Sequence, residues 1–200
     1  SKRVVVALSP ADSQRIHFSI PLPTRRRQLM QRMPTGSVIK CILIYDQPFW
    51  RAQGLSGEMV SDESTENTPL RMCFDGSPPD SELGVLVGFI LGDAAPLWSE
   101  SGPDSRRRAV SKQLVEFFGP AAAHPREYID KDWCRDDWTH GCYVGLMPPG
   151  VMSSIGSVIR QPCGHVHWAG TETASQWNGY MEGALQSAER AAQEVTDALR

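Results

Sequence analysis

A strand, a glycine turn and a long helix stand at the end of the sequence, and their order constrains the fold more than any other feature. The segment HVHWAG (165–170) predicts a short strand, and the polar stretch TETASQWNGY (171–180) leads from it into the last helix. Small and apolar residues recur in that helix at intervals of three or four, which predicts a buried face. They are Tyr180, Ala184, Ala188, Ala191, Val195 and Leu199. This arrangement is typical of an α/β protein.

The turn before the last helix is a candidate ligand site. A helix N-terminus offers free N–H groups and the positive end of a dipole to a ligand above the turn. Gly170, Gly179 and Gly183 would let backbone approach closely, and Glu172 could accept hydrogen bonds from ligand hydroxyls. A plain strand-to-helix connection that binds nothing is the alternative, and the residues alone leave both open.

The first residues predict a strand with no partner nearby in the sequence. The β-branched run from Arg3 to Leu8 is apolar on both faces, so we expect it in the middle of a sheet. No initiator methionine or targeting peptide precedes it. We therefore expect the chain to be a piece of a larger protein.

Between these ends the pattern predicts a mixture of helices and strands. We expect a helix that begins at Thr24 as N-cap and ends before Pro34, and a helix over 104–118. We expect a strand within 37–50, a hairpin of strands 71–74 and 85–91, and a loop-dominated stretch over 121–164.

Composition excludes several classes of protein. The chain has 200 residues, 40% of them hydrophobic and 22% charged, with a net charge of −3, which favours a globular protein over a nucleic-acid binder. Its five cysteines contain no CxxC pair, and its histidines show no metal-ligand spacing, so we expect no metal, no disulfide framework and a reducing compartment. No apolar stretch approaches the roughly 20 residues that span a bilayer.

Three segments resemble, in the same order, motifs of the flavin-containing monoamine oxidase family. They are GSVIKCILIYDQPFWR, DWCRDDWTHGCYVGLMPPGVMSSIGSVIRQP and WAGTETASQWNGYMEGALQSAERAAQEV. The family's Gly-rich G-x-G-x-x-G fingerprint is absent, so the chain looks like the C-terminal portion of such an oxidase. The resemblance implies part of an FAD/NAD(P)-binding, glutathione-reductase-like Rossmann domain in residues 1–28 and 138–200. It also implies part of a mixed-sheet substrate domain of the amine oxidase type in residues 29–137.

The resemblance also implies the site residues. Cys142 would be the attachment point of FAD, through a thioether to the 8α-methyl of the isoalloxazine, although some relatives hold FAD without a covalent bond. Trp133 matches a tryptophan that packs close to the flavin. The other residues that the resemblance places against FAD are Gly170, Thr171, Glu172, Gly179, Tyr180 and Met181.

Three residues match catalytic positions of the family. Tyr143 and Tyr180 would flank the substrate amine, because aromatic π faces attract a cation and can polarise a neutral amine. Half-buried core or interface tyrosines are the alternative. Lys40 lies in an apolar strand where an unpaired ammonium is costly, and the family's lysine holds a water near the flavin. A strand-edge lysine that reaches solvent is the alternative.

The activity implied is FAD-dependent oxidative deamination of primary or secondary amines to aldehyde, ammonia and hydrogen peroxide. The expected partners are an amine, O2 and the N-terminal half of the same protein, with a homodimer left open, and the fragment alone is expected to be inactive. A polyamine, putrescine or L-amino-acid oxidase is one alternative, and a non-catalytic interaction or folding unit is another. We expect a cytoplasmic location, or the mitochondrial outer membrane if a C-terminal anchor has been removed.

Overall fold

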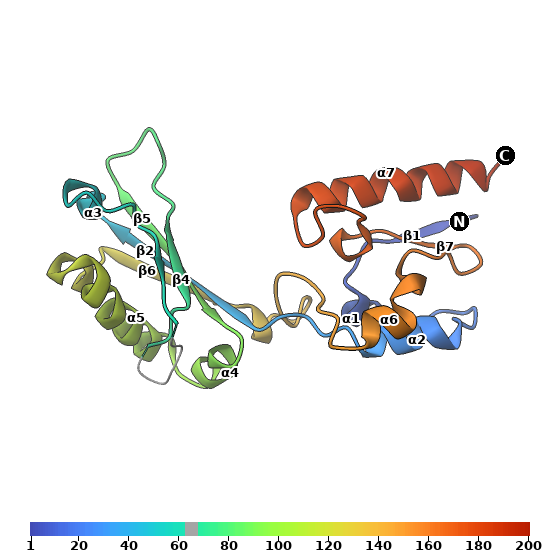
Figure 1. Ribbon diagram of the computed structural model, residues 1–200, viewed down its shortest axis with the longest axis horizontal. Coiled ribbons are helices and arrows are strands. Elements are labelled where there is room, and N and C mark those ends of the chain that lie inside the picture. Colours follow the sequence, from blue (N-terminus) through green and yellow to red (C-terminus); the bar gives the residue numbers. More distant parts are fainter. Residues whose placement is uncertain (63–67) are drawn as a thin grey trace. The chain divides into compact units, whose positions relative to one another are not determined.

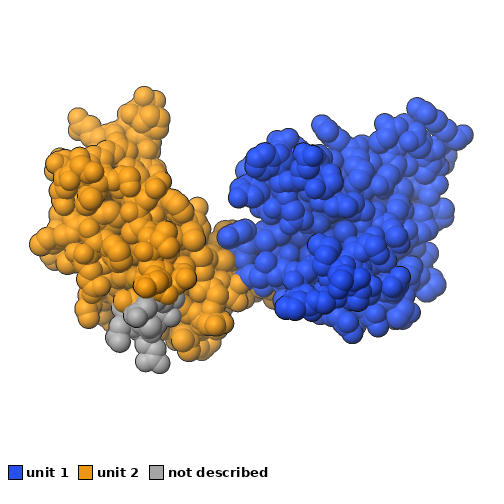
Figure 2. Space-filling view, viewed as in Figure 1, with its two compact units in different colours: residues 1–36, 142–200 blue, residues 37–141 orange. Residues whose placement is uncertain are grey.

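The structure is a computed structural model that describes residues 1–62 and 68–200, and it divides into two compact units. Unit 1 consists of Ser1–Gly36 and Cys142–Arg200, and unit 2 consists of Ser37–Gly141 (Figure 2). The chain thus leaves unit 1 after residue 36 and returns to it at residue 142. The boundaries expected from sequence followed residues 28 and 137, and part of the expected middle segment, residues 63–67, lies outside the described residues.

Unit 2 is built on a five-stranded antiparallel sheet with the strand order β3-β4-β5-β2-β6. The strands are β2 (Val38–Tyr45), β3 (Met59–Val60), β4 (Met72–Asp75), β5 (Gly84–Leu91) and β6 (Glu127–Asp132). Helices α4 (Ala94–Ser99) and α5 (Pro103–Phe118) pack against one face of this sheet (Figure 1). A short helix α3 (Phe49–Ala52) follows β2. The predicted hairpin is confirmed as β4 and β5, and the predicted helix over 104–118 is α5.

The period-two pattern of β2 explains why the core lies on one face of the sheet. Ile39, Cys41 and Leu43 are each 0% exposed, and they pack with Val110 and Leu114 of α5. Lys40, Ile42 and Ile44 alternate with them and are half-buried on the opposite face. Burial of one face by two helices therefore specifies the register of β2.

The expectation of a loop over 121–164 is wrong in part, because this stretch contains β6 and several short helices. The helices are η1 (Pro120–Ala123), η2 (Trp133–Arg135), α6 (Val151–Ile155) and η3 (Gly156–Ile159). Strand β6 has the sequence EYIDKD, whose four charged residues give no apolar alternation. It is held by pairing with β2 and forms an edge of the sheet, where charged side chains are common.

Unit 1 is built around a pair of parallel strands, β1 (Val4–Val6) and β7 (Val166–Trp168). Helix α7 (Met181–Asp197) lies on one side of this pair, and α2 (Thr24–Gln31) lies on the other (Figure 1). A four-residue helix α1 (Pro10–Ser13) precedes α2, and η4 (Thr171–Thr173) connects β7 to the segment before α7. The buried cluster between β7 and α2 includes Val6, Met30 and Trp168.

One local expectation for unit 1 is not tested by this chain, and another is corrected. Among the described residues β1 pairs with β7 alone, with Val4 46% and Val5 44% exposed, so its place in the middle of a larger sheet stays a prediction. Thr24 is not a helix N-cap: Pro23 holds that position, and Thr24 is the first residue of α2. Proline at this position leaves no side-chain acceptor for the first N–H groups.

The buried face of α7 agrees only in part with the expected one. Ala191 is buried as predicted, but the other buried residues are Gly183 and Ser187, and the predicted Tyr180 is 66% exposed. At Gly183 the helix lies close to the backbone of Trp177 in the preceding segment, which leaves no room for a larger side chain there. No helix in the described parts of the chain is long and apolar enough to cross a membrane.

Candidate functional site

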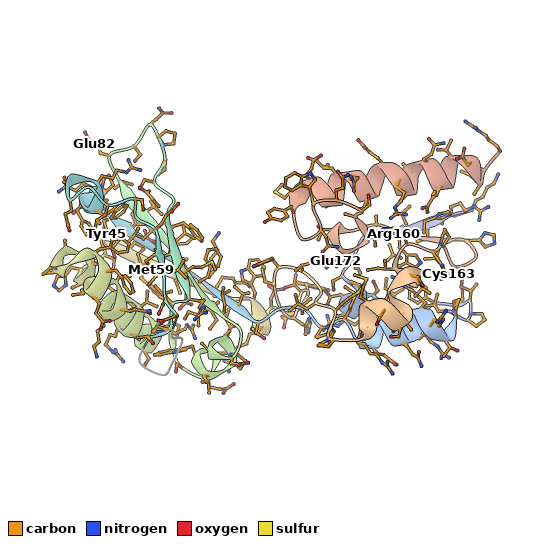
Figure 3. The ribbon with its side chains drawn as sticks, viewed as in Figure 1. Tyr45, Met59, Glu82, Arg160, Cys163 and Glu172 are labelled. Atoms are coloured by element: carbon orange, nitrogen blue, oxygen red, sulfur yellow. The ribbon has the colours of Figure 1, made fainter. Side chains whose placement is uncertain are left out.

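Two loops of unit 1 that are distant in the sequence are tied together by a buried carboxylate. Glu172 is 6% exposed, and its Oε1 accepts a hydrogen bond of 2.9 Å from the backbone N–H of Gly145. Figure 3 shows Glu172 on the segment between β7 and α7. A methyl group built on Gly179 would lie 3.9 Å from the Val144 side chain, which is ordinary contact. The loop that follows Cys142 therefore packs on the loop that leads into α7.

The loop before α7 is closed by its own polar side chains. The N–H of Gly179 donates to Oγ1 of Thr171 at 2.7 Å, and that hydroxyl donates to the carbonyl of Tyr180 at 2.9 Å. The side-chain amide of Asn178 donates to the carbonyls of Thr171 and Glu172, each at 3.1 Å. These bonds satisfy backbone groups in a segment without regular structure and hold it in one conformation.

The structure explains why glycine occupies each of the three positions that were predicted to allow close approach of the backbone. Gly170 and Gly179 have φ values of 105° and 87°, which side chains rarely adopt. A methyl group on Gly183 would lie 2.2 Å from the carbonyl oxygen of Trp177. The N–H of Gly170 also donates to Oγ of Ser187 in α7 at 3.0 Å. The close approach at Gly183 is thus between α7 and its own preceding loop.

Large apolar side chains are exposed on these two tied loops. Tyr143 is 67% exposed, Trp177 60%, Tyr180 66% and Met181 87%. The rings of Trp177 and Tyr180 meet edge to face with centroids 6.0 Å apart. The exposure excludes a core position for Tyr143 and Tyr180 within this chain, and the alternative of an interface position stays open. Cys142, which precedes Tyr143, is half-buried. Exposed apolar groups gathered in this way mark a surface that contacts a ligand or another segment.

Lys40 and Trp133 belong to unit 2. Lys40 lies on β2 between β5 and β6, so the alternative of an edge-strand lysine is wrong. Its Nζ is 5.9 Å from the ring centroid of Phe89, and its cross-strand partner on β6 is Lys131. Trp133 follows β6 and is half-buried, with Nζ of Lys131 5.3 Å from its ring centroid.

The structure therefore brings most of the predicted site residues together in unit 1. This group consists of Cys142, Tyr143, Gly170, Thr171, Glu172, Gly179, Tyr180 and Met181. Sequence reasoning missed Asn178 and Ser187, which tie the same loop to itself and to α7. An asparagine in a glycine-flanked polar turn is a known turn signal that could have found the first of them.

Two other cysteines are unsuited to attachment chemistry. Cys41 and Cys73 are each 0% exposed. Burial raises the pKa of each thiol to about 12, and the thiolate is the reactive form. In the described chain, no group of three or more histidine, cysteine and acidic side chains could hold a metal ion.

The sheet and helix arrangement and the glycine-rich tied loops agree with a cofactor-binding α/β protein. The chain belongs to the flavin containing amine oxidoreductase family, whose sequence profile matches residues 1–196. The family is one of flavoprotein oxidoreductases, so the predicted resemblance is confirmed.

Curated proteins that the chain resembles include flavin-containing monoamine oxidases. It is 47% identical over 199 residues to the probable flavin-containing monoamine oxidase A of Dictyostelium discoideum, covering 100% of this chain and 43% of that protein. It is 42% identical over 197 residues to a flavin-containing amine oxidase A of Bos taurus, covering 98% of this chain and 37% of that protein. The chain thus spans about two fifths of the length of these relatives. The expected placement in the C-terminal portion of such an oxidase is not borne out by these comparisons.

Solved structures support the same family. The cyclohexylamine oxidase from Brevibacterium oxydans has a TM-score of 0.93 and 39% identity, covering 100% of this chain and 43% of that chain. A putrescine oxidase bound to putrescine has a TM-score of 0.91 and 29% identity, covering 98% of this chain and 42% of that chain. The mixed α/β fold predicted from sequence is confirmed at this level.

Proposed function

We propose that this chain forms the flavin-contacting and amine-contacting parts of an FAD-dependent amine oxidase that converts amines to aldehyde, ammonia and hydrogen peroxide. The observation that carries the proposal is the hydrogen bond between Glu172 and Gly145. It joins the loop that carries Cys142 and Tyr143 to the segment that leads to Tyr180, and both tyrosines are exposed. Family membership supports the same activity. In this proposal unit 1 is part of a Rossmann-type FAD domain, and unit 2 is part of the substrate domain.

The residues present fit FAD on three grounds. No side chain caps the N-terminus of α7, so its first N–H groups are available to an electron-rich ligand. The exposed rings of Tyr143 and Tyr180 offer apolar surface to an isoalloxazine. The positive φ of Gly170 turns the backbone between β7 and α7 without a side chain in the way. Gly170, Thr171, Glu172, Gly179, Tyr180 and Met181 would contact the cofactor, together with Trp133.

When bound, FAD would supply the redox chemistry, taking a hydride equivalent from the amine and passing electrons to O2. The protein's own residues position the substrate. The phenol rings of Tyr143 and Tyr180 would orient a neutral amine by their electron-rich faces. The ammonium of Lys40, set among Ile42 and Phe89, would hold a water for the reaction with oxygen.

Cys142 is proposed as the site of a covalent thioether to FAD. The test is acid precipitation of the intact flavin-loaded enzyme, with the pellet inspected for flavin absorbance. The pellet of the unaltered enzyme should keep its colour, and that of Cys142→Ser should lose it. Cys134→Ser is the matched control, since Cys134 is also half-buried, and its pellet should stay coloured. A colourless pellet from the unaltered enzyme would refute the linkage and leave FAD binding intact.

The oxidase activity itself is tested by peroxide release. With benzylamine as substrate, the intact enzyme should give a rate that rises with pH until the substrate amine is deprotonated, because only the neutral amine has a free lone pair. Lys40→Met should slow the oxygen reaction more than amine binding. A flat pH profile through that range, or no peroxide from any amine, would refute the proposal and favour a non-catalytic unit.

Putrescine oxidation is a second candidate, because a putrescine oxidase has the same fold over 98% of this chain. The half-buried face of β2 favours an amine with an apolar body, since Ile42 and Ile44 lie on the face that carries Lys40. We therefore expect a higher kcat/KM for benzylamine than for putrescine or an L-amino acid. The reverse order would identify the polyamine or amino-acid alternative.

A further inference from the structure

The carboxylate of Asp132, at the end of β6, bonds to two different elements of unit 2. Its Oδ1 accepts a hydrogen bond of 3.0 Å from the backbone N–H of Cys134, which makes Asp132 the N-cap of the 3-10 turn η2. Its Oδ2 accepts a hydrogen bond of 2.5 Å from Oγ of Ser99, the last residue of α4. The side chain of Asp132 is only 10% exposed. Both oxygens are engaged, so the carboxylate is held in one orientation.

Ser99 is a fixed donor, because the end of α4 is tied to the rest of unit 2. Ser99 is 5% exposed. The guanidinium of Arg106 in α5 donates to the backbone carbonyls of Trp98 and Ser101, which stand on either side of it in the sequence. The same guanidinium donates to the carboxylate of Asp130 in β6. These charge-assisted hydrogen bonds hold the hydroxyl of Ser99 beside the end of β6.

The place of the Trp133 ring depends on the turn that Asp132 caps. Trp133 is the first of only three residues in η2, and the first N–H groups of such a turn have no partner within it, so the capping bond has a large share in holding it. The ring is half-buried, and Nζ of Lys131 lies 5.3 Å from its centroid. Lys131 is held in turn by Asp136, with Nζ and Oδ2 2.8 Å apart. A rotation of η2 would move the indole away from these groups.

We propose that Ser99 and Asp132 are positioning residues for Trp133, and that through this ring they set the environment of the bound flavin. The inference rests on the proposed function, because it takes Trp133 as a contact of FAD. Ser99 orients the carboxylate of Asp132, and Asp132 caps the turn that carries the ring. A buried hydroxyl of α4 thereby acts on the cofactor site through the two hydrogen bonds of one carboxylate.

Fluorine NMR of the intact enzyme, labelled with fluorotryptophan, follows the Trp133 ring directly. Trp133→Phe identifies the resonance of Trp133 by its loss. Ser99→Ala should shift that resonance by more than its line width, whereas those of Trp50 and Trp168, which are buried elsewhere, should stay in place. An unmoved Trp133 resonance in Ser99→Ala would overturn the proposal.

Ser111→Ala is the matched control for Ser99→Ala. Ser111 is also a buried helical serine of unit 2, at 7% exposed, and its Oγ has no hydrogen-bond partner among the described residues. The control therefore removes the same atom from a similar environment without breaking a hydrogen bond. It should leave the Trp133 resonance in place, and an equal shift in both variants would contradict a specific role for Ser99.

Two variants of Asp132 test whether its hydrogen bonds hold the ring. Asp132→Asn keeps an oxygen for the N–H of Cys134 and offers an amide N–H to Oγ of Ser99. It should therefore keep the Trp133 resonance near its unaltered position. Asp132→Ala loses both bonds and should move the resonance further than Ser99→Ala does. Ser99→Ala removes a single oxygen atom, so the test stands if Asp132→Ala does not fold. Equal displacement in Asp132→Asn and Asp132→Ala would overturn the role of these bonds.

Visible circular dichroism of the bound flavin tests the step from Trp133 to the cofactor. Ser99→Ala should change the flavin spectrum, but it should change nothing further in an enzyme that already carries Trp133→Phe, because it acts through that ring. An equal response with and without Trp133 would overturn the route through this residue. A displaced fluorine resonance with an unchanged flavin spectrum would support the positioning of Trp133 and refute its proposed contact with FAD, so the two failures are distinguishable.

Discussion

The carboxylate of Glu172 and the backbone N–H of Gly145 are joined by a hydrogen bond of 2.9 Å across 27 positions of sequence. Both residues are buried, so this bond to a charged acceptor is shielded from water. It fixes the loop that carries Cys142 and Tyr143 against the loop that carries Tyr180. The proposed flavin and amine surface depends on this contact.

Replacement of Glu172 should release the loop that follows Cys142. Glu172→Ala removes the acceptor of the Gly145 N–H, and loss of a buried bond to a charged group costs about 1.5–3 kcal/mol. Hydrogen exchange of the Gly145 amide should therefore become at least about tenfold faster. Glu189→Ala, an exposed glutamate on α7, is the control and should leave that amide unchanged. Equal protection of Gly145 in both variants would contradict a role for Glu172 in holding the loop.

Gly183 is required by close packing and not by helix propensity. Alanine favours a helix over glycine by about 1 kcal/mol, so propensity alone predicts that Gly183→Ala stabilises α7. The added methyl would lie 2.2 Å from the Trp177 carbonyl oxygen, and overpacking of this kind costs about 1–3 kcal/mol. We expect a net lower stability in urea denaturation. Gly102→Ala, where nothing lies within 4 Å, should change stability little. A stabilised Gly183→Ala would show that the loop moves aside.

A buried ion pair between Arg106 and Asp130 connects α5 to β6. The Nε–Oδ2 distance is 2.7 Å, both side chains are 7% exposed, and the hydrogen bond to Asp130 raises the pKa of Arg106. Asp130→Asn should lower the free energy of unfolding by about 3–5 kcal/mol, because it leaves a buried guanidinium without its carboxylate.

An exposed ion pair between Arg126 and Asp46 is the control for the buried pair of Arg106 and Asp130. The distance between Nη1 of Arg126 and Oδ1 of Asp46 is 3.6 Å, and the two side chains are 65% and 84% exposed. Asp46→Asn should change the free energy of unfolding by less than about 1 kcal/mol, as is usual for exposed pairs. Urea denaturation of both variants checks the difference. Equal losses would mean that the burial of Arg106 and Asp130 has no special effect.

Asp75 should make unit 2 sensitive to acid. Burial opposes its ionisation, but hydrogen bonds from Ser77, Trp50 and Arg51 outweigh that effect and lower its pKa from 3.8 to about 2. Since the folded pKa lies below the unfolded one, the stabilisation is present above about pH 4 and is lost as the pH falls towards 2. The difference in stability between the unaltered chain and Asp75→Asn should therefore be larger at pH 6 than at pH 2.5, by urea denaturation. A difference that does not change with pH would contradict the lowered pKa.

Much of the fold follows from local patterns in the sequence. The alternation within β2, the hairpin of β4 and β5 and the helical spacing of α5 each depend on residues close together in the chain. The same holds for the strand, glycine turn and helix of 165–199, and for the three motifs that indicated the family. The elements could be predicted because hydrophobic periodicity reports which face of an element is apolar, whereas the family was indicated by the resemblance of the three motifs.

Contacts between residues distant in the sequence decided the features of the fold that local patterns did not predict. Strand β6 exists because β2 offers it a partner, and its charged sequence alone did not predict it. The sequence placed Tyr180 and Ala191 on the buried face of α7, but the structure buries Gly183 and Ser187 together with Ala191, and the Trp177 backbone leaves no room for a larger side chain at Gly183. The position of Lys40 on a central strand likewise depends on pairing with both β5 and β6. By itself the sequence determined most of the longer elements and the family. Strand pairing, the burial of particular side chains and the hydrogen bond between Glu172 and Gly145 were decided by tertiary structure, since they are properties of surfaces that meet only in the folded chain.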